Sequence, residues 1–392
     1  MPTSTFPTAD RVQGITPFLV MEVLERAQAM QQAGVDVIHL EVGEPDFATP
    51  ACIVEAGKRA LDAGHTHYTA SPGDPELRAA VAAYYGRRYG VGVDAGQVLL
   101  FPGTSPGMML LFSAILNPGD EVILSNPAYA CYANFVRFAG GVVREVLTHE
   151  EDGFQYRPED VARAIGPRTR AIMVNSPCNP TGIVLEAERM RALGELGEAG
   201  PLIISDEIYH GLTYAGPEHS MLEFTDNAVI IGGFSKAFAM TGWRLGYLVA
   251  PPALVRPLHV LLQNFFISPN AAVQRAAVAA LEQADADVAR MRGVYDERRR
   301  YLLGALRELG FQIPVEPCGA FYMLINARHL AEKFGGSSVS LAFDILEKAH
   351  VGLTPGVDFG SQTEGFLRLS YASSLENLHE AVRRLREYIA HF

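Results

Sequence analysis

The sequence contains few cysteines and no long hydrophobic segment. Its four cysteines, at positions 52, 131, 178 and 318, form neither a CxxC pair nor the dense pattern of a disulfide framework. The longest apolar runs, such as Met108–Leu116, are too short to span a bilayer. The first residues, MPTSTFPTADRV, lack the basic and apolar regions of an export signal. These absences predict a cytoplasmic setting and no membrane partner.

The chain also lacks any run of basic residues. Its formal net charge is −12, which argues against a nucleic-acid partner. Hydrophobic residues make up 48% of the chain and charged residues 19%, a composition typical of globular proteins with a large core. At 392 residues, more than one domain is expected.

From about Gln97 onward, short apolar runs alternate with helical patterns. QVLLF, EVILS, VVREVL, RAIMVNSP, PLIIS, AVIIGGFS and RLGYLVA are predicted as strands, most of them separated by amphipathic segments. This alternation predicts an α/β fold with a mostly parallel sheet covered by helices on both faces. Ligands of such sheets bind at the carboxyl ends of the strands.

The pattern changes after about Pro269. A long helical tract runs from there to the segment ALREL, and FYMLINA and FLRLSYA are predicted as strands of a smaller α+β unit. The last helix is predicted to begin with a capping box from Ser373 to Glu376. We expect a large domain at 45–285 and a small domain made of 1–44 and 286–392.

Two motifs resemble binding sites, one for a dinucleotide and one for a metal, but the neighbouring sequence argues against both. GVGVDA (Gly90–Ala95) resembles a dinucleotide-binding loop, but a helical segment precedes it and a strand follows, the reverse of what that fingerprint needs. We interpret it as a turn. His65 and His67 have no cysteine or carboxylate partners nearby in the sequence, so no metal site is predicted.

Four polar clusters fall where predicted strands end. PGTSPG (Pro102–Gly107) opens a helix and fits either a phosphate cradle or an ordinary turn. NSPCNPTG (Asn175–Gly182) fits a turn when taken alone. In SDEIYH, Asp206 follows a buried strand, where a carboxylate is costly unless it is paired or solvated. The fourth cluster, GGFSKAFAMTGWRLGY, places Lys236 among small and apolar residues.

Taken in order, these segments resemble one family. SKAFAMTGWRLG is similar to the cofactor-lysine signature of class I/II aminotransferases of the aspartate, alanine and aromatic type, which are fold-type I enzymes that use pyridoxal phosphate. The resemblance extends to LEVGEPDFATP, HYTASPGDPELR, NPGDEVILSNPAYACY, CGAFYML and FLRLSYAS, and so covers most of the chain. It implies a seven-stranded sheet and transfer of an amino group from an L-amino acid to a 2-oxo acid.

The resemblance also implies roles for the residues around the cofactor ring. Lys236 would form the Schiff base with the cofactor aldehyde and then act as the base, a task helped by apolar surroundings that lower a lysine pKa. Asp206 would pair with the pyridine nitrogen. Asn179 and the catalytic Tyr209 would bond the ring oxygen, and Tyr129 would stack on the ring.

The cofactor phosphate would be bound by Arg244, Thr104 and Ser105. Many relatives carry a hydroxyl residue three positions before the lysine, but this chain has Gly233 there. We expect the missing contact to be absent or supplied elsewhere, for example by Ser235. Two further departures are Pro106, which removes an N–H donor, and Cys178, which we interpret as a packed small residue.

The substrate would be held chiefly by Arg368, because an arginine can bind the α-carboxylate in a bidentate manner. Gly43 and Asn179 would lie beside the same carboxylate. Tyr68 would reach a phosphate in the neighbouring subunit, since the family builds its sites at a homodimer interface.

Two alternatives stay open. A cysteine-conjugate β-lyase would use the same fold and cofactor residues, although AMTGWR after the lysine favours transfer. A ligand-sensing regulator is disfavoured because no helix-turn-helix pattern precedes the fold. The side-chain specificity is expected to depend partly on the region Ile15–Leu19, and no second carboxylate-binding arginine is evident, which disfavours strict dicarboxylate specificity.

Overall fold

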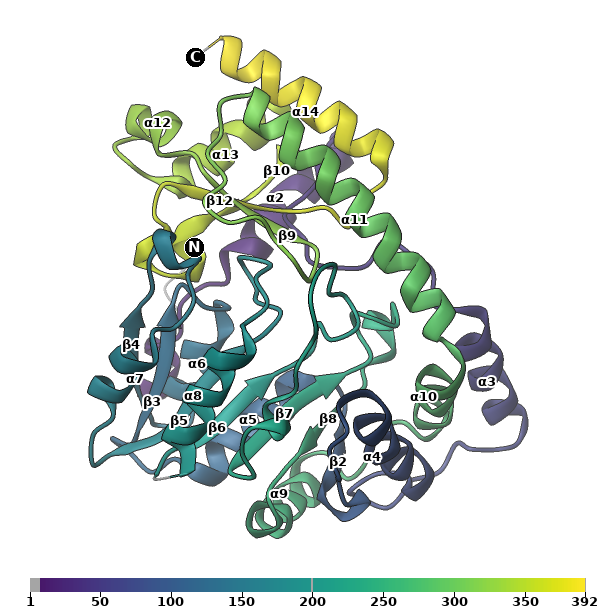
Figure 1. Cartoon of the computed structure of the whole chain (residues 1–392). Helices are drawn as coiled ribbons and strands as arrows, with labels where there is room; N and C mark the ends of the chain where they lie inside the picture. The colour runs from purple at the N-terminus through teal and green to yellow at the C-terminus, as the bar shows by residue number, and fades with distance from the viewer. Residues whose placement is uncertain (1–7, 199, 392) are drawn as a thin grey trace.

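A computed structural model describes residues 8–198 and 200–391. Its centre is a seven-stranded sheet in the order β2–β8–β7–β6–β5–β3–β4 (Figure 1). Only β8 runs antiparallel to its neighbours in this sheet, which confirms the predicted mostly parallel arrangement. The strands are β2 (Val98–Phe101), β3 (Glu121–Asn126), β4 (Val142–Leu147), β5 (Thr169–Asn175), β6 (Leu202–Asp206), β7 (Ala228–Gly233) and β8 (Gly246–Val249).

Helices cover both faces of this sheet. In β2, Val98 and Leu100 join one hydrophobic cluster while Leu99 and Phe101 join the other, because successive side chains of a strand point to opposite faces. One face packs against α5 (Thr104–Ile115), α6 (Cys131–Phe138) and α9 (Pro252–Phe265). The other packs against α4 (Pro75–Tyr89), α8 (Ala187–Glu198) and α10 (Ala271–Gln283). Both faces of the inner strands are therefore buried, as their continuous apolar sequences predict, whereas the edge strand β4 is largely exposed.

A second group of elements lies above the carboxyl edge of the large sheet in Figure 1. It contains an antiparallel sheet in the order β11–β12–β9 and a short parallel pair, β1–β10. These strands are β1 (Ile38–His39), β9 (Tyr322–Asn326), β10 (Val351–Gly352), β11 (Thr354–Pro355) and β12 (Phe366–Ser370). The surrounding helices are α2 (Leu19–Gln32), α11 (Asp285–Glu308), α12 (Arg328–Ala331), α13 (Ser338–Ala349) and α14 (Leu375–Ala390).

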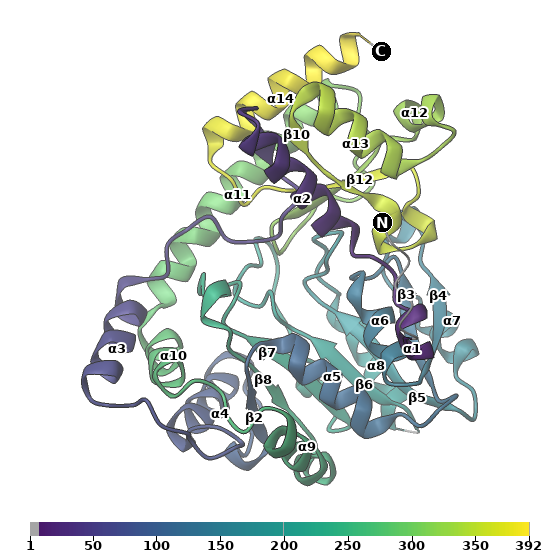
Figure 2. The ribbon, with the colours of Figure 1, turned by 180° about the vertical axis from the view of Figure 1, so that it is seen from behind.

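Helix α11 connects the two groups. It leaves α10 beside the large sheet and runs along one side of the molecule to α14, as the two opposite views show (Figures 1 and 2). The chain's N-terminal part returns the other way, because α2 lies in the upper group while α3 (Ala51–Asp62) packs against α10. The space between the groups receives polar residues from both.

Two local predictions need correction. The predicted single helical tract after Pro269 is divided at Ala284 into α10 and α11. The predicted capping box at Ser373 is wrong: Ser374 is the N-cap, and its hydroxyl accepts from the backbone N–H of Asn377. The Ser373 hydroxyl instead accepts from the Asn377 side chain. Two adjacent serines offer the same capping chemistry, so the sequence alone did not separate them.

The GVGVDA segment is a turn, as predicted, because Gly90 ends α4 in the left-handed conformation and β2 follows shortly after. The remaining helices are α1 (Asp10–Gln13), α7 (Pro158–Ala164) and the short 3₁₀ turns η1 (Ala95–Gln97), η2 (Glu150–Asp152), η3 (Met221–Glu223), η4 (Thr241–Trp243), η5 (Glu332–Phe334), η6 (Gly356–Phe359) and η7 (Ser361–Thr363). Within residues 8–198 and 200–391, no helix has the length and apolarity needed to cross a membrane.

Candidate active site

A cleft of about 320 Å³ lies where the carboxyl ends of the large sheet meet the second group of elements. It brings together eleven of the twelve side chains or backbone positions that the sequence predicted for the site. These are Gly43, Thr104, Ser105, Tyr129, Asn179, Asp206, Tyr209, Ser235, Lys236, Arg244 and Arg368. The twelfth, Tyr68, does not line this cleft and is 79% exposed on the surface.

Lys236 enters the cleft three residues after β7 ends at Gly233. Its Nζ donates to the backbone carbonyl of Gly43 at 2.7 Å and lies 6.0 Å from the centre of the Tyr209 ring. Burial lowers the pKa of Lys236 to about 8, although the nearby Glu44 acts in the opposite direction. A substantial fraction of this amine is therefore neutral, and nucleophilic, just above neutral pH.

Asp206 is the last residue of β6 and is almost fully buried. The hydroxyl of Tyr132 donates to its carboxylate at 2.6 Å, and the backbone N–H of Ile208 donates at 3.1 Å. Burial raises the pKa of Asp206 to about 6, while these two hydrogen bonds lower it. In this part of the structure the carboxylate has no ion-pair partner within 4 Å, so it is available to a cationic ligand.

The start of α5 offers donors that the helix itself leaves free. No side chain caps this helix, and the Arg244 guanidinium lies against its first residues. Gly103 has a φ of 103°, and a Cβ there would lie 2.7 Å from Arg244 Nη2. Free N–H groups, two hydroxyls and a guanidinium make a binding site for a phosphate. Glycine at 103 permits this close approach.

The unexpected Gly233 has a structural explanation at the same place. A Cβ at position 233 would lie 2.8 Å from Ile208 Cδ1 and 3.2 Å from Thr104 Cγ2. A serine at 233 would therefore fit only if the terminal methyl of Ile208 moved and Thr104 shifted by a few tenths of an ångström. Thr104 and Ser235 both line the cleft and carry hydroxyls.

Arg368 is 2% exposed and lies on β12. Its guanidinium donates to Asn179 Oδ1 at 2.9 Å, to Thr354 Oγ1 at 3.2 Å and to the carbonyl of Glu41, and it stacks on the Tyr322 ring. All these partners are neutral, and Nε has no hydrogen-bond partner. A buried cation without a carboxylate partner among the described residues is suited to bind an anionic ligand.

Asn179 and Tyr209 lie between Arg368 and Asp206. Asn175 fixes Asn179 by accepting its backbone N–H at 2.9 Å, and donates from its own amide to the Asp206 carbonyl. The Tyr209 and Tyr322 hydroxyls share a hydrogen bond of 2.8 Å. Asn175, Tyr132 and Tyr322 also line this cleft but were not predicted as site residues, although they lie in segments that carry the family resemblance.

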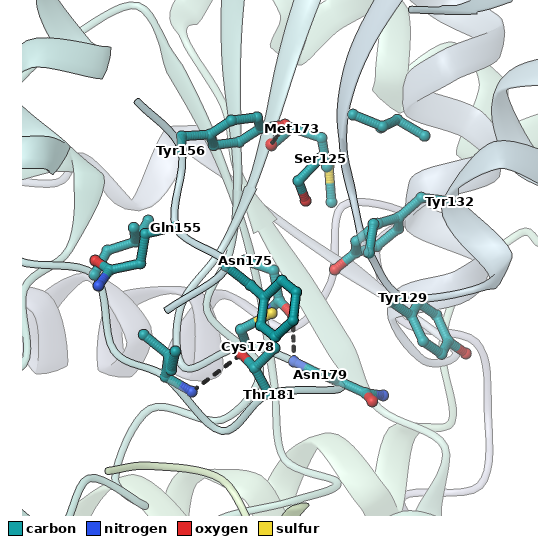
Figure 3. A pocket seen from close by; sticks show the side chains of 15 residues that line it. Ser125, Tyr129, Tyr132, Gln155, Tyr156, Met173, Asn175, Cys178, Asn179 and Thr181 are labelled. Atoms are coloured by element: carbon teal, nitrogen blue, oxygen red, sulfur yellow. Dashed lines mark hydrogen bonds between the residues drawn. The ribbon is translucent and has the colours of Figure 1, made fainter. Parts of the chain in front are cut away.

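A smaller cavity lies behind Asn175, Asn179, Tyr129 and Tyr132 (Figure 3). Its volume of about 30 Å³ is large enough for water but too small for an amino acid. Cys178 lines it, and burial raises the pKa of this thiol. The thiol thus stays protonated, in agreement with the interpretation of Cys178 as a packed residue.

Comparison with known proteins identifies the fold and the chemistry. Residues 35–385 match the family model described as aminotransferase class I and II. The chain belongs to this family. An aspartate aminotransferase of Geobacillus stearothermophilus is 38% identical over 388 residues, covering 97% of this chain and 98% of the relative. An aspartate/prephenate aminotransferase of Thermus thermophilus is 41% identical over 379 residues, covering 95% and 96%.

Solved structures agree. The Thermus thermophilus aspartate aminotransferase with maleate has a TM-score of 0.93 at 40% identity and covers 98% of this chain and 100% of its own. An aminotransferase from Mycobacterium tuberculosis has a TM-score of 0.93 at 34% identity, covering 99% and 100%. The protein is thus a fold-type I aminotransferase that uses pyridoxal phosphate to move an amino group from an amino acid to a 2-oxo acid.

The cleft residues fit this cofactor. Asp206, a carboxylate with a raised pKa, lines the cleft and suits a pyridinium partner. Lys236, an amine with a lowered pKa, lines the same cleft. The uncapped N–H groups at the start of α5, together with the Arg244 guanidinium, suit a phosphate. The donors and acceptors therefore match the three polar ends of pyridoxal phosphate. Nothing in the comparisons favours the β-lyase alternative.

Proposed function

We propose that the cleft carries out amino transfer with Lys236 as the cofactor lysine and proton carrier. When bound, pyridoxal phosphate supplies an aldehyde that reacts with amines and a protonated ring that withdraws electrons from the substrate Cα. Lys236 would hold the cofactor through its Nζ and, once a substrate amine has taken that place, would accept the proton from the substrate Cα. The contact of its Nζ with the Gly43 carbonyl supports this role, because it holds the amine at the floor of the cleft.

Asp206 is proposed to hold the positive charge on the ring nitrogen, which keeps the ring able to accept electrons. Tyr132 fixes the orientation of that carboxylate. Asn179 and Tyr209 would bond the ring oxygen, and Tyr129 would cover one ring face. Arg244, Thr104, Ser105 and Ser235 would bind the phosphate; all four line the cleft.

Arg368 would hold the substrate α-carboxylate, next to Gly43 and Asn179. The single observation that best supports the whole assignment is that this buried guanidinium has only neutral partners and lies in the same cleft as Lys236. An α-amino acid bound to Arg368 by its carboxylate would direct its amino group and Cα toward the amine that acts on them.

We further propose a homodimer with shared sites, to which Tyr68 of each subunit contributes. Its 79% exposure outside the cleft of its own chain supports this. The proposed domains remain 45–285 and 1–44 with 286–392, with residues 1–7 outside the described structure. A cytoplasmic location is proposed because all four cysteines are unpaired. We expect no nucleic-acid or membrane partner.

The test is a half-reaction. The protein is loaded with pyridoxal phosphate and mixed with one amino acid and no 2-oxo acid, and both the 2-oxo acid formed and any ammonia are measured. Transfer predicts at most one 2-oxo acid per site and no ammonia. A β-lyase would release ammonia and pyruvate over many turnovers from a suitable cysteine conjugate. Lys236→Ala should give neither product; full steady-state turnover by that variant would reject the role of Lys236.

A further inference from the structure

The wall of the cleft formed by the N-terminal segment is apolar. Phe18, Val20 and Met21 line the cleft at the start of α2. The Phe18 ring meets the Tyr129 ring edge-on, with 5.9 Å between centroids. Val20 is buried, while Met21 is 44% exposed, so this wall extends from the floor of the cleft to solvent.

This wall is hydrogen-bonded to the segment that contains Asp358 and Phe359, which also contacts Arg368. The Asp358 carboxylate accepts the backbone N–H groups of Leu19 at 3.1 Å and Val20 at 3.4 Å, and so caps α2 from a distant part of the chain. The next residue, Phe359, stacks on the Arg368 guanidinium at 4.9 Å. The apolar wall and the carboxylate-binding arginine therefore have a fixed relative position.

Among the described residues of this chain, the cleft lining leaves no free cation for a second carboxylate. Its lining contains three cations from this chain, Lys236, Arg244 and Arg368, and the proposed function uses all three. The acidic side chain in contact with the wall is Asp358, and Glu44 lines the cleft mouth. A side-chain carboxylate placed against Phe18 and Val20 would lose water without gaining a cationic partner.

We propose that the enzyme's preferred amino donors carry uncharged apolar side chains, such as leucine, methionine and phenylalanine, which bind against Phe18, Val20 and Met21. This inference rests on the proposed function, because Arg368 and Lys236 fix the carboxylate and amine and leave only the side chain to face this wall. It differs from what the names of the relatives called aspartate aminotransferases would suggest for this chain.

The experiment measures kcat/KM of the half-reaction for leucine, methionine, phenylalanine, alanine, aspartate and glutamate with the loaded enzyme. We expect at least a tenfold preference for the bulky apolar donors over aspartate and glutamate. If aspartate or glutamate equals or exceeds them while transfer occurs, this inference is wrong and the proposed function stands. If no amino acid gives a 2-oxo acid, the proposed function itself fails, and this inference with it.

Two variants sharpen the result. Phe18→Ala should lower the ratio of kcat/KM for leucine over alanine by about tenfold, since one or two methylene contacts are worth that much in an apolar pocket. Met21→Lys should raise kcat/KM for aspartate and glutamate by about tenfold by adding the missing cation. Leu147→Ala, a half-exposed residue on the edge strand β4, is the matched control and should leave every ratio unchanged. Unaltered ratios in both Phe18→Ala and Met21→Lys would overturn the placement of the side chain.

Discussion

The hydroxyl of Tyr132 donates to the Asp206 carboxylate at 2.6 Å, with both groups buried. This bond opposes the effect of burial, which raises the pKa of Asp206 to about 6. The ionised form of Asp206 is the one that can hold a charged ring nitrogen. In the role proposed for Asp206, Tyr132 would therefore help to set the pH range in which the cofactor is held in its reactive form.

Tyr132→Phe should move the acid limb of the activity profile to higher pH. Without the hydroxyl, the pKa of Asp206 rises further, and more of the carboxyl is protonated near pH 6. We expect the half-reaction rate at pH 6 to fall about tenfold or more and to recover as the pH rises, because a hydrogen bond to a charged group is worth about 1.5–3 kcal/mol. Tyr156→Phe is the control, since this buried hydroxyl donates to the Met173 carbonyl instead. An unchanged profile in Tyr132→Phe would contradict the account.

Asp206→Asn should stabilise the cofactor-free protein while strongly slowing the half-reaction. The pKa of Asp206 is raised from 3.8 to about 6 by folding, so its contribution to the free energy of unfolding is fully present below pH 3.8. That contribution is lost as the pH rises through about 6. At about 1.4 kcal/mol per pH unit, the cost above pH 6 is up to about 3 kcal/mol, which the neutral amide avoids. Urea unfolding of the cofactor-free protein at pH 7.5 measures this gain, and the half-reaction rate should drop by about 100-fold or more.

The matched control is Asp120→Asn. Hydrogen bonds from Asn117 lower the pKa of Asp120, with a further contribution from Arg170, so loss of that charge should destabilise the protein. Opposite signs for the two substitutions are the expected outcome. A loss of stability in both variants would show that the ionised Asp206 carboxylate does not destabilise the folded protein.

Arg368→Lys should lower kcat/KM for every amino acid by about 100-fold, because lysine cannot offer two parallel donors to a carboxylate. Most of the change should appear in KM, while the spectrum of the bound cofactor stays the same. Arg298→Lys is a suitable control: Arg298 is also buried and forms a two-bond ion pair with Asp46, but it does not line the cleft. Equal KM effects in both variants would indicate a general loss of structure.

Gly233→Ser should weaken cofactor binding, by about tenfold in Kd, even though the family resemblance implies a hydroxyl residue there. The new Cβ would lie 2.8 Å from Ile208 Cδ1 and 3.2 Å from Thr104 Cγ2, so both side chains must shift, and overpacking costs about 1–3 kcal/mol where the neighbours yield poorly. Ile208→Val removes that Cδ1, so the double variant should bind pyridoxal phosphate at least as tightly as the natural protein. Tighter binding by Gly233→Ser alone would contradict this explanation of the glycine.

The sequence predicts the parts of the site that follow directly from strand ends. Asp206 is the last residue of a buried strand, Asn179 and Lys236 follow the ends of two others, and parallel strands bring such residues to one edge. Arg368 and Arg244 needed the family resemblance, since nothing in their local sequence separates them from surface arginines.

Contacts between distant segments were not predictable in this way. Tyr129 and Tyr132 lie three residues apart, and only the packing of α6 shows that Tyr132 reaches Asp206, 74 residues later. The cap on α2 by Asp358 likewise joins residues more than 300 positions apart. Such contacts depend on how the two groups of elements meet, which no local pattern encodes.

The identity of the cofactor lysine is the central claim, and the chain offers a direct test. It contains four lysines, Lys58, Lys236, Lys333 and Lys348, and only Lys236 lines the cleft. The loaded protein is reduced with borohydride, digested, and its peptides are analysed by mass spectrometry for the phosphopyridoxyl group. We predict one group per chain, on Lys236, and none when Lys236→Ala is treated in the same way. Stoichiometric labelling of another lysine, or no labelling of Lys236 in a fully loaded protein, would contradict the account.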